Sequence, residues 1–206
     1  QTKNHRGVYS FCMCPGGYVI NSASENNSLV VNGMSNYLRD SNTANSAIVV
    51  TVSKKDYGEG LFAGVKYQQE LEKKAYLKGN GKIPVEYYQD FLNKKITKKE
   101  TDFAILGAYT FTDLNDILPV TISDSIKEAM IEFNKKIKNF SDSNPLLAGV
   151  ETRTSSPIKI IRDEKLESNI KGIYPCGEGS GYAGGITSSA IDGIKVAEEI
   201  IKKYYY

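Results

Sequence analysis

The sequence carries near its end a glycine-rich stretch, Gly177-Glu178-Gly179-Ser180-Gly181-Tyr182-Ala183-Gly184-Gly185. Before it lies Ile170–Pro175, a β-prone run that predicts a strand, and after it lies Thr187–Lys203, which has the apolar spacing of a helix. Glycines let a backbone approach a ligand closely, and the free N–H groups at a helix start favour an anion or a carbonyl oxygen. We therefore expect a strand-turn-helix unit whose turn can bind a ligand.

Within this stretch, Gly179, Gly181 and Gly184 satisfy the G-x-G-x-x-G pattern of dinucleotide-binding turns. The opening unit of a Rossmann domain needs a further strand after the helix, with an acidic residue about 20 residues beyond the last glycine. That strand is absent from the sequence. Two interpretations stay open: the closing strand-turn-helix of a flavin domain whose opening unit lies elsewhere, or a tight turn that packs a helix on a sheet and binds nothing.

The composition is typical of a folded globular protein. Among 206 residues, 40% are hydrophobic and 24% are charged, and Lys plus Arg at 26 nearly balance Asp plus Glu at 24. This balance argues against a nucleic-acid-binding protein, and no apolar run approaches the length of roughly 18 residues that a membrane span needs. We expect a cytoplasmic protein without a membrane partner, and the three cysteines predict reduced thiols rather than disulfides.

The remaining patterns predict an α+β fold. Short β-prone runs predict an antiparallel or mixed sheet, interrupted by a loop at Cys14–Gly17 and a turn at Asn32-Gly33. Apolar spacing predicts helices, whereas residues 82–112 are Lys- and Tyr-rich and predict a partly exposed excursion. The predicted strands are Val8–Met13, Tyr18–Asn21, Leu29–Val31, Ala47–Val52, Pro157–Ile161 and Ile170–Pro175. The predicted helices are Leu61–Lys78, a helix with apolar positions from Ile126 to Phe140 (capped by Thr121, Ser123 or Asp124 and ended by Asn144-Pro145) and Thr187–Lys203.

Five blocks of the sequence carry a resemblance to a known family: Arg6–Gly17, Val31–Ser35, Asn42–Ala47, Gly149–Pro157 and Tyr174–Val196. They resemble the C-terminal part of bacterial FAD-dependent dehydrogenases, also described as NAD-utilizing dehydrogenases. The resemblance implies that residues 1–148 are part of a substrate-side domain and that residues 149–206 close the FAD-binding domain. It also implies a missing N-terminal half as partner, without which the chain is expected to be inactive and free of FAD.

The resemblance implies roles for the glycine turn. Gly177 and Gly179 would contact FAD, Glu178 would accept a hydrogen bond from a ribityl hydroxyl, and Gly184, Gly185 and Ile186 would face the flavin ring or the pyrophosphate. The reaction would be hydride transfer through FAD to or from an unidentified small substrate. NADH or NADPH is the possible electron donor.

Two further places are candidates for the substrate. The resemblance implies that the thiol of Cys14 and the loop residues Pro15, Gly16 and Gly17 lie near the flavin or its substrate, although a buried structural thiol is equally compatible with the sequence. Arg153 has a planar donor fork that suits a carboxylate or a phosphate, or a salt bridge to Glu151 or Glu178.

Other functions rest on weaker patterns. No metal site is predicted, because the spacing of Cys12, Cys14, Cys176 and the single His5 does not suggest one. A lone histidine near the start also makes a His-dependent hydrolase improbable. The alternatives are a non-enzymatic module that binds a protein or a phosphate, and a thiol-dependent redox protein centred on Cys14. The oligomeric state is left open.

Overall fold

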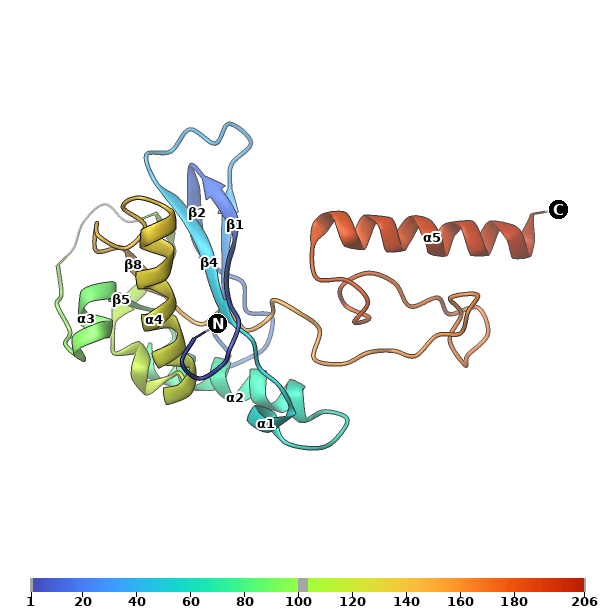
Figure 1. The fold of residues 1–206 in the computed structure, drawn as a ribbon, viewed down its shortest axis with the longest axis horizontal. Helices are drawn as coiled ribbons and strands as arrows, with labels where there is room; N and C mark the ends of the chain where they lie inside the picture. Colours follow the sequence, from blue (N-terminus) through green and yellow to red (C-terminus); the bar gives the residue numbers. More distant parts are fainter. Residues whose placement is uncertain (1, 100–103, 206) are drawn as a thin grey trace. The chain divides into compact units, whose positions relative to one another are not determined.

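A computed structural model describes residues 2–99 and 104–205, and the chain divides into two compact units (Figure 1). The first unit comprises residues 1–56 and 68–152, and the second comprises residues 57–67 and 153–206. Helices and both antiparallel and mixed sheets occur together, so the predicted α+β class is confirmed. The assignment of domains to the substrate and to FAD stays a prediction.

Two sheets are built from the first half of the first unit. Strand β1 (Val8–Pro15) pairs antiparallel with β4 (Ala44–Val50). Strand β2 (Gly17–Asn21) lies between β3 (Val31–Ser35), which is antiparallel to it, and β6 (Ile105–Leu106), which is parallel. The predictions Val8–Met13, Tyr18–Asn21 and Ala47–Val52 are therefore confirmed with shifted ends, whereas only Val31 of the predicted strand Leu29–Val31 lies in a strand.

Two turn predictions in this region were wrong. Only Gly16 separates β1 from β2, so the expected four-residue loop at Cys14–Gly17 is a tight corner in which Gly16 takes a left-handed φ of 60°. Asn32 and Gly33 lie inside β3 and pair with β2, because the strand continues past them to Ser35.

The third sheet has the order β7–β5–β8, from β7 (Tyr109–Phe111), β5 (Ile83–Tyr87) and β8 (Leu146–Ala148). Strand β5 is central and its first four residues are buried, so the predicted partly exposed excursion over 82–112 contains a buried strand, while residues 93–99 are exposed. It leads directly into α3 (Tyr88–Asn93), and the short 3-10 helix η1 (Leu114–Asp116) follows β7. The sequence around β5 is rich in lysine, which indicated an exposed segment. Strand β5 is nevertheless buried, because it lies between two other strands.

Helices α2 (Ala63–Lys78) and α4 (Val120–Lys136) confirm the two helix predictions, and the short α1 (Lys54–Tyr57) precedes α2. Leu71 and Ala75 of α2 are buried, as their spacing predicts. The predicted α4 caps were wrong, because Pro119 occupies the N-cap. The helix ends at Lys136, so the predicted end at Asn144-Pro145 was also wrong, although Phe140 still packs edge-on against Phe133, with ring centroids 5.6 Å apart.

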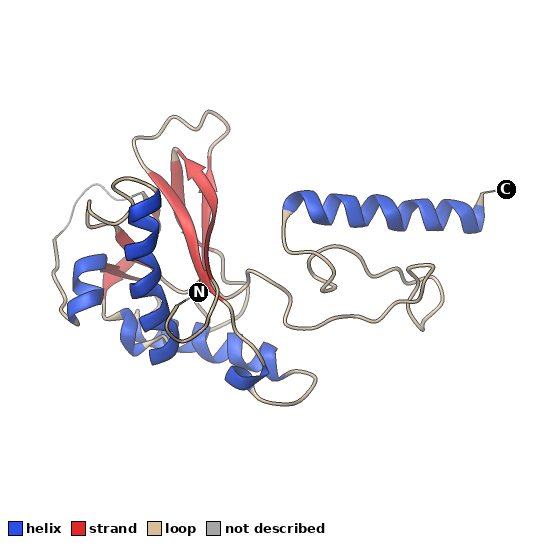
Figure 2. Cartoon of the chain, in the orientation of Figure 1, coloured by secondary structure: helices blue, strands red, loops and turns tan. Residues whose placement is uncertain are grey.

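The second unit consists of loops, the start of α2 and the helix α5 (Ile186–Tyr204) (Figure 2). The predicted strands Pro157–Ile161 and Ile170–Pro175 were wrong, because the β structure in the described part of this unit is limited to an isolated bridge between Arg162 and Ser168. Their backbone groups bond within loops instead, as where the Ile160 N–H donates to the Ser180 carbonyl at 3.0 Å. The glycine turn therefore joins a loop, not a strand, to a helix.

No helix in residues 2–99 and 104–205 combines the length and the apolar character needed to cross a membrane.

Candidate functional site

The glycine turn is closed by its own backbone. The carbonyl oxygen of Gly177 accepts the N–H groups of Tyr182 and Ala183 at 3.1 and 3.2 Å. Gly177 and Gly181 have φ values of 73° and 83°, in the left-handed region that favours glycine. A Cβ on Gly181 would also overlap the carbonyl oxygen of Ile158 and lie 2.9 Å from Cα of Lys159. Close packing therefore requires glycine at position 181.

An ion pair ties this turn to α5. Arg162 donates to both carboxylate oxygens of Asp192, at 3.0 and 2.6 Å, and to the Pro175 carbonyl at 2.7 Å. The Gly177 N–H donates to Asp192 Oδ2 at 2.9 Å. The hydrogen bond from Arg162, followed by that from Gly177, holds the pKa of Asp192 down at about 2. The carboxylate is therefore charged at neutral pH and fixes the first glycine of the turn.

Tyr182 in the turn lies against cationic groups. The guanidinium carbon of Arg162 is 3.6 Å from the Tyr182 ring centroid, and the Lys159 amine is 4.4 Å from it. Cations at these distances are attracted to the face of an aromatic ring. Arg162 thus orders the turn twice, through Asp192 and through the ring. The prediction from sequence had not included Arg162, Asp192 or Lys159 in the site.

The other side of the turn is open. No atom lies within 4 Å of where a Cβ would stand on Gly179 or Gly184. Gly185 is the N-cap of α5 and provides no side-chain cap, and Ile186 is 91% exposed. The first N–H groups of a helix have no partner within the helix, so they can receive an anion or a carbonyl oxygen here without an intervening side chain. This backbone fits the phosphate or ring edge of a dinucleotide.

Residues Gly177–Ile186 are thus brought together in one turn, and Glu178 lies half-buried within it. The individual roles of Gly177, Glu178, Gly179, Gly184, Gly185 and Ile186 toward FAD stay predictions. Arg153 is exposed and is the first residue of the second unit's C-terminal segment.

The predicted substrate residues lie in the first unit, at the corner between β1 and β2. Cys14 is half-buried and forms no disulfide, Pro15 is exposed, and Gly16 and Gly17 are buried. A Cβ on Gly16 would overlap the backbone of Arg39, so packing accounts for a glycine there. A β-bulge with Cys12 at φ 51° interrupts the regular alternation of the strand before Cys14. The contact of this corner with a substrate stays a prediction.

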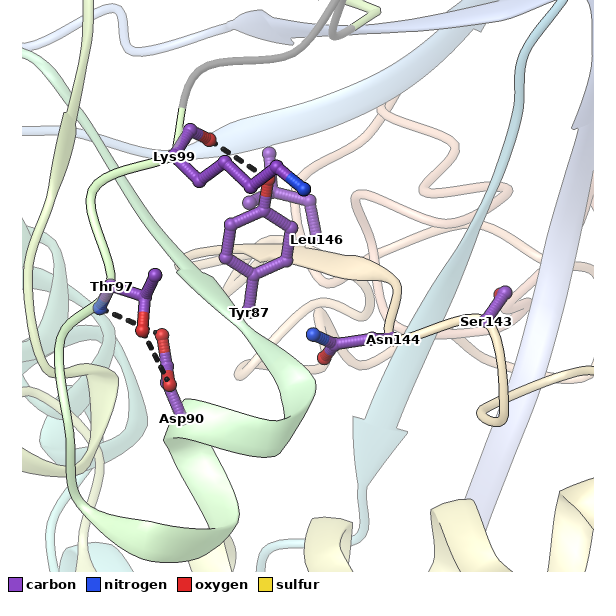
Figure 3. Close-up of a pocket in the computed structure, with 7 residues that line it drawn as sticks. All are labelled: Tyr87, Asp90, Thr97, Lys99, Ser143, Asn144 and Leu146. Atoms are coloured by element: carbon purple, nitrogen blue, oxygen red, sulfur yellow. Dashed lines mark hydrogen bonds between the residues drawn. The ribbon is translucent and has the colours of Figure 1, made fainter.

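A hollow of about 520 Å³ lies in the first unit (Figure 3). The Thr97 N–H and hydroxyl donate to the two carboxylate oxygens of Asp90, at 2.8 and 3.1 Å, and the Tyr87 hydroxyl donates to the Lys99 carbonyl at 2.9 Å. These polar groups satisfy one another rather than converging on a ligand. The lining residues are Tyr87, Asp90, Thr97, Lys99, Ser143, Asn144 and Leu146.

A buried carboxyl lies in the central strand β5. Glu86 is 1% exposed, its Oε2 accepts the Leu114 N–H at 2.9 Å, and its Oε1 has no hydrogen-bond partner among the described residues. Burial, together with the nearby charges of Asp113 and Asp90, raises the pKa of Glu86 to about 7, although the hydrogen bond from Leu114 acts in the opposite direction. In residues 2–99 and 104–205, no three His, Cys, Asp or Glu side chains are grouped so as to hold a metal ion.

A family model described as "FAD-dependent protein, C-terminal domain-like" matches residues 1–154. The chain belongs to this family. The chain is also 47% identical, over 208 residues, to an uncharacterized protein of Clostridium beijerinckii. That match covers 98% of this chain and 39% of the relative, so the chain spans about two fifths of the relative's length. The family match covers the first unit's residues, and the glycine turn lies beyond it.

Proposed function

We propose that this chain is the C-terminal part of a cytoplasmic flavin-dependent oxidoreductase, in which hydride passes through FAD to or from a small substrate. Its membership of an FAD-dependent family supports the cofactor. The observation that carries the proposal is the open glycine turn before α5, where an uncapped helix start and the bare backbone of Gly184 leave room for an anionic ligand. NADH or NADPH is the proposed electron donor.

In this proposal the chain's residues bind and orient, and FAD when bound supplies the capacity to accept and release a hydride. Gly177, Gly179, Gly184, Gly185 and Ile186 would hold it through their backbone. The carboxylate of Glu178 would accept a hydrogen bond from a hydroxyl of the cofactor. Asp192 and Arg162 would be positioning residues, because they fix Gly177 without facing the open side.

The substrate would be held by groups that the structure leaves at or near the surface. The half-buried thiol of Cys14, at the end of β1, would lie against the substrate beside Pro15, Gly16 and Gly17. The exposed guanidinium of Arg153 would hold a carboxylate or a phosphate of the substrate. The partner in this proposal is the N-terminal half of the same protein.

The test is the flavin content of the protein produced from the full reading frame, released by denaturation and measured by absorbance and fluorescence. We expect flavin in near-equal amount to protein. Gly184→Val should lose it, because the added side chain fills the open side of the turn, whereas Gly193→Val in α5 should retain it. Neither glycine has an atom within 4 Å of its Cβ position, so the two variants are matched for packing. A folded, colourless wild-type protein that takes up no FAD would refute the proposal, as would equal flavin in both variants.

A further inference from the structure

The second unit has almost no hydrophobic core. Val196, at 5% exposure, is the one buried hydrophobic side chain among the unit's described residues. By contrast, the first unit buries side chains such as Leu29, Val85 and Phe91 completely. Burial of apolar surface is the main favourable term in folding, so a segment of this size with one buried hydrophobic residue needs another surface to pack against.

Helix α5 shows where that surface binds. The side of α5 that faces its own unit carries two charged residues and one buried valine. Asp192 pairs with Arg162, Val196 is buried, and the Lys203 amine bonds Glu167 Oε2 at 2.7 Å. These three positions are four and seven residues apart, so they lie on one side of the helix.

The opposite side of α5 is apolar and exposed. Ile186, Ile194 and Ile201 are 91%, 60% and 54% exposed, and Ala190 and Ala197 between them are also exposed. These five residues follow the three- and four-residue spacing of a single helix face, which we call the isoleucine stripe. Such a stripe normally packs into a protein core, and the apolar spacing of Thr187–Lys203 predicted a helix without showing that an apolar side would face outward.

We propose that the isoleucine stripe docks on the part of the intact polypeptide that precedes residue 1. This inference rests on the proposed function, since it needs the chain to be the C-terminal part of a longer protein. The matched relative has more than half of its length outside the match, and the family is described as a C-terminal domain, so that length would precede it. A covalently linked partner also binds at high effective concentration, which favours it over a second copy.

The test measures the accessibility of single cysteines in the protein from the full reading frame. Ile194→Cys places a thiol on the stripe, and Lys195→Cys places one on the neighbouring exposed position as the matched control. N-ethylmaleimide modification is followed peptide by peptide by mass spectrometry, which separates these sites from the native cysteines. We expect Ile194→Cys to react at least tenfold more slowly than Lys195→Cys in the native protein, and both to react equally in urea. If Ile194→Cys does not fold, Ile201→Cys tests the same face.

A photocrosslinker on Ile194→Cys then identifies the occupant. A crosslink to the segment preceding residue 1, within one molecule, supports the proposal. Equal labelling rates of the two variants, a crosslink to residues 2–152, or a crosslink between isotopically distinct copies would overturn it. Flavin is measured in the same preparation: protection without flavin would refute the cofactor proposal and leave the docking intact, and flavin without protection would do the reverse.

Discussion

The buried carboxyl of Glu86 makes the stability of the first unit depend on pH, and Glu86→Gln should remove that dependence. The pKa of Glu86 is about 7 in the folded protein against an ordinary value of 4.5. The folded state therefore holds this proton more tightly than the unfolded state does. As a result, the free energy of unfolding falls as the pH rises from 4.5 through 7.

The difference of about 2.5 pKa units corresponds to roughly 3 kcal/mol of stability lost above pH 7. Glutamine cannot ionise, and its amide oxygen can still accept the Leu114 N–H. Its amide N–H groups need partners where Oε1 now has none, which costs roughly 1–3 kcal/mol at every pH. The free energy of unfolding of the variant minus that of wild type should therefore be about 3 kcal/mol higher at pH 8 than at pH 4.5, whatever the absolute stability of the variant.

The assay is urea unfolding followed by circular dichroism at both pH values. Glu132→Gln is the surface control, since Glu132 is exposed and its pKa is lowered by the hydrogen bond from Lys135. That variant should show no such gain with pH. If wild type and Glu86→Gln changed in parallel between pH 4.5 and pH 8, the buried, protonated carboxyl would be disproved.

Three further predictions concern the second unit and the cofactor. Asp192→Asn should lower the free energy of unfolding of the turn by about 1–2 kcal/mol at pH 7, a value discounted for solvent near the ion pair. This difference between variant and wild type should disappear as the pH falls from 4 to 2, because protonation of the wild-type carboxylate removes the same bond. Amide hydrogen exchange across residues 177–186 measures this, and equal protection at pH 7 would contradict it. Gly181→Ala should lower the free energy of unfolding of the turn by roughly 1–3 kcal/mol, because position 181 has a left-handed φ and its added Cβ would overlap Ile158. Gly179→Ala should lower it far less, because its added Cβ meets no atom. The rates of protease cleavage within the turn compare the two variants. The isolated 206-residue chain should bind no stoichiometric FAD in equilibrium dialysis, and one flavin per chain would show that the preceding half is not needed.

The sequence predicted correctly those helices and strands whose signal lies within a single segment of the chain. The apolar spacing of α2, α4 and α5 and the β-prone run at β1 were sufficient to locate those elements, because each signal lies within one element. Strand β5 was missed because its burial comes from β7 and β8, which are distant in sequence. Segment 157–161 was wrongly predicted as a strand, because β propensity forms a strand only where a partner strand is available.

The candidate site divides in the same way. The glycine stretch at 177–185 was recognisable, because its residue types are unusual and contiguous. The pair of Arg162 and Asp192, which fixes it, was not recognisable, since the residues are 30 positions apart and neither lies in a motif. The outward orientation of α5 could have been inferred only by noticing that Asp192 and Lys203 lie opposite its isoleucines.

The bond between Asp192 and the Gly177 N–H has a thermodynamic consequence. Helix α5 carries the isoleucine stripe on one side and, on the other, the carboxylate that restrains the glycine turn. Whatever reduces the fraying of α5 also reduces the conformational entropy that the turn must lose when it receives a ligand. Linkage makes this effect reciprocal, so a ligand at the turn strengthens contacts at the stripe by the same coupling free energy.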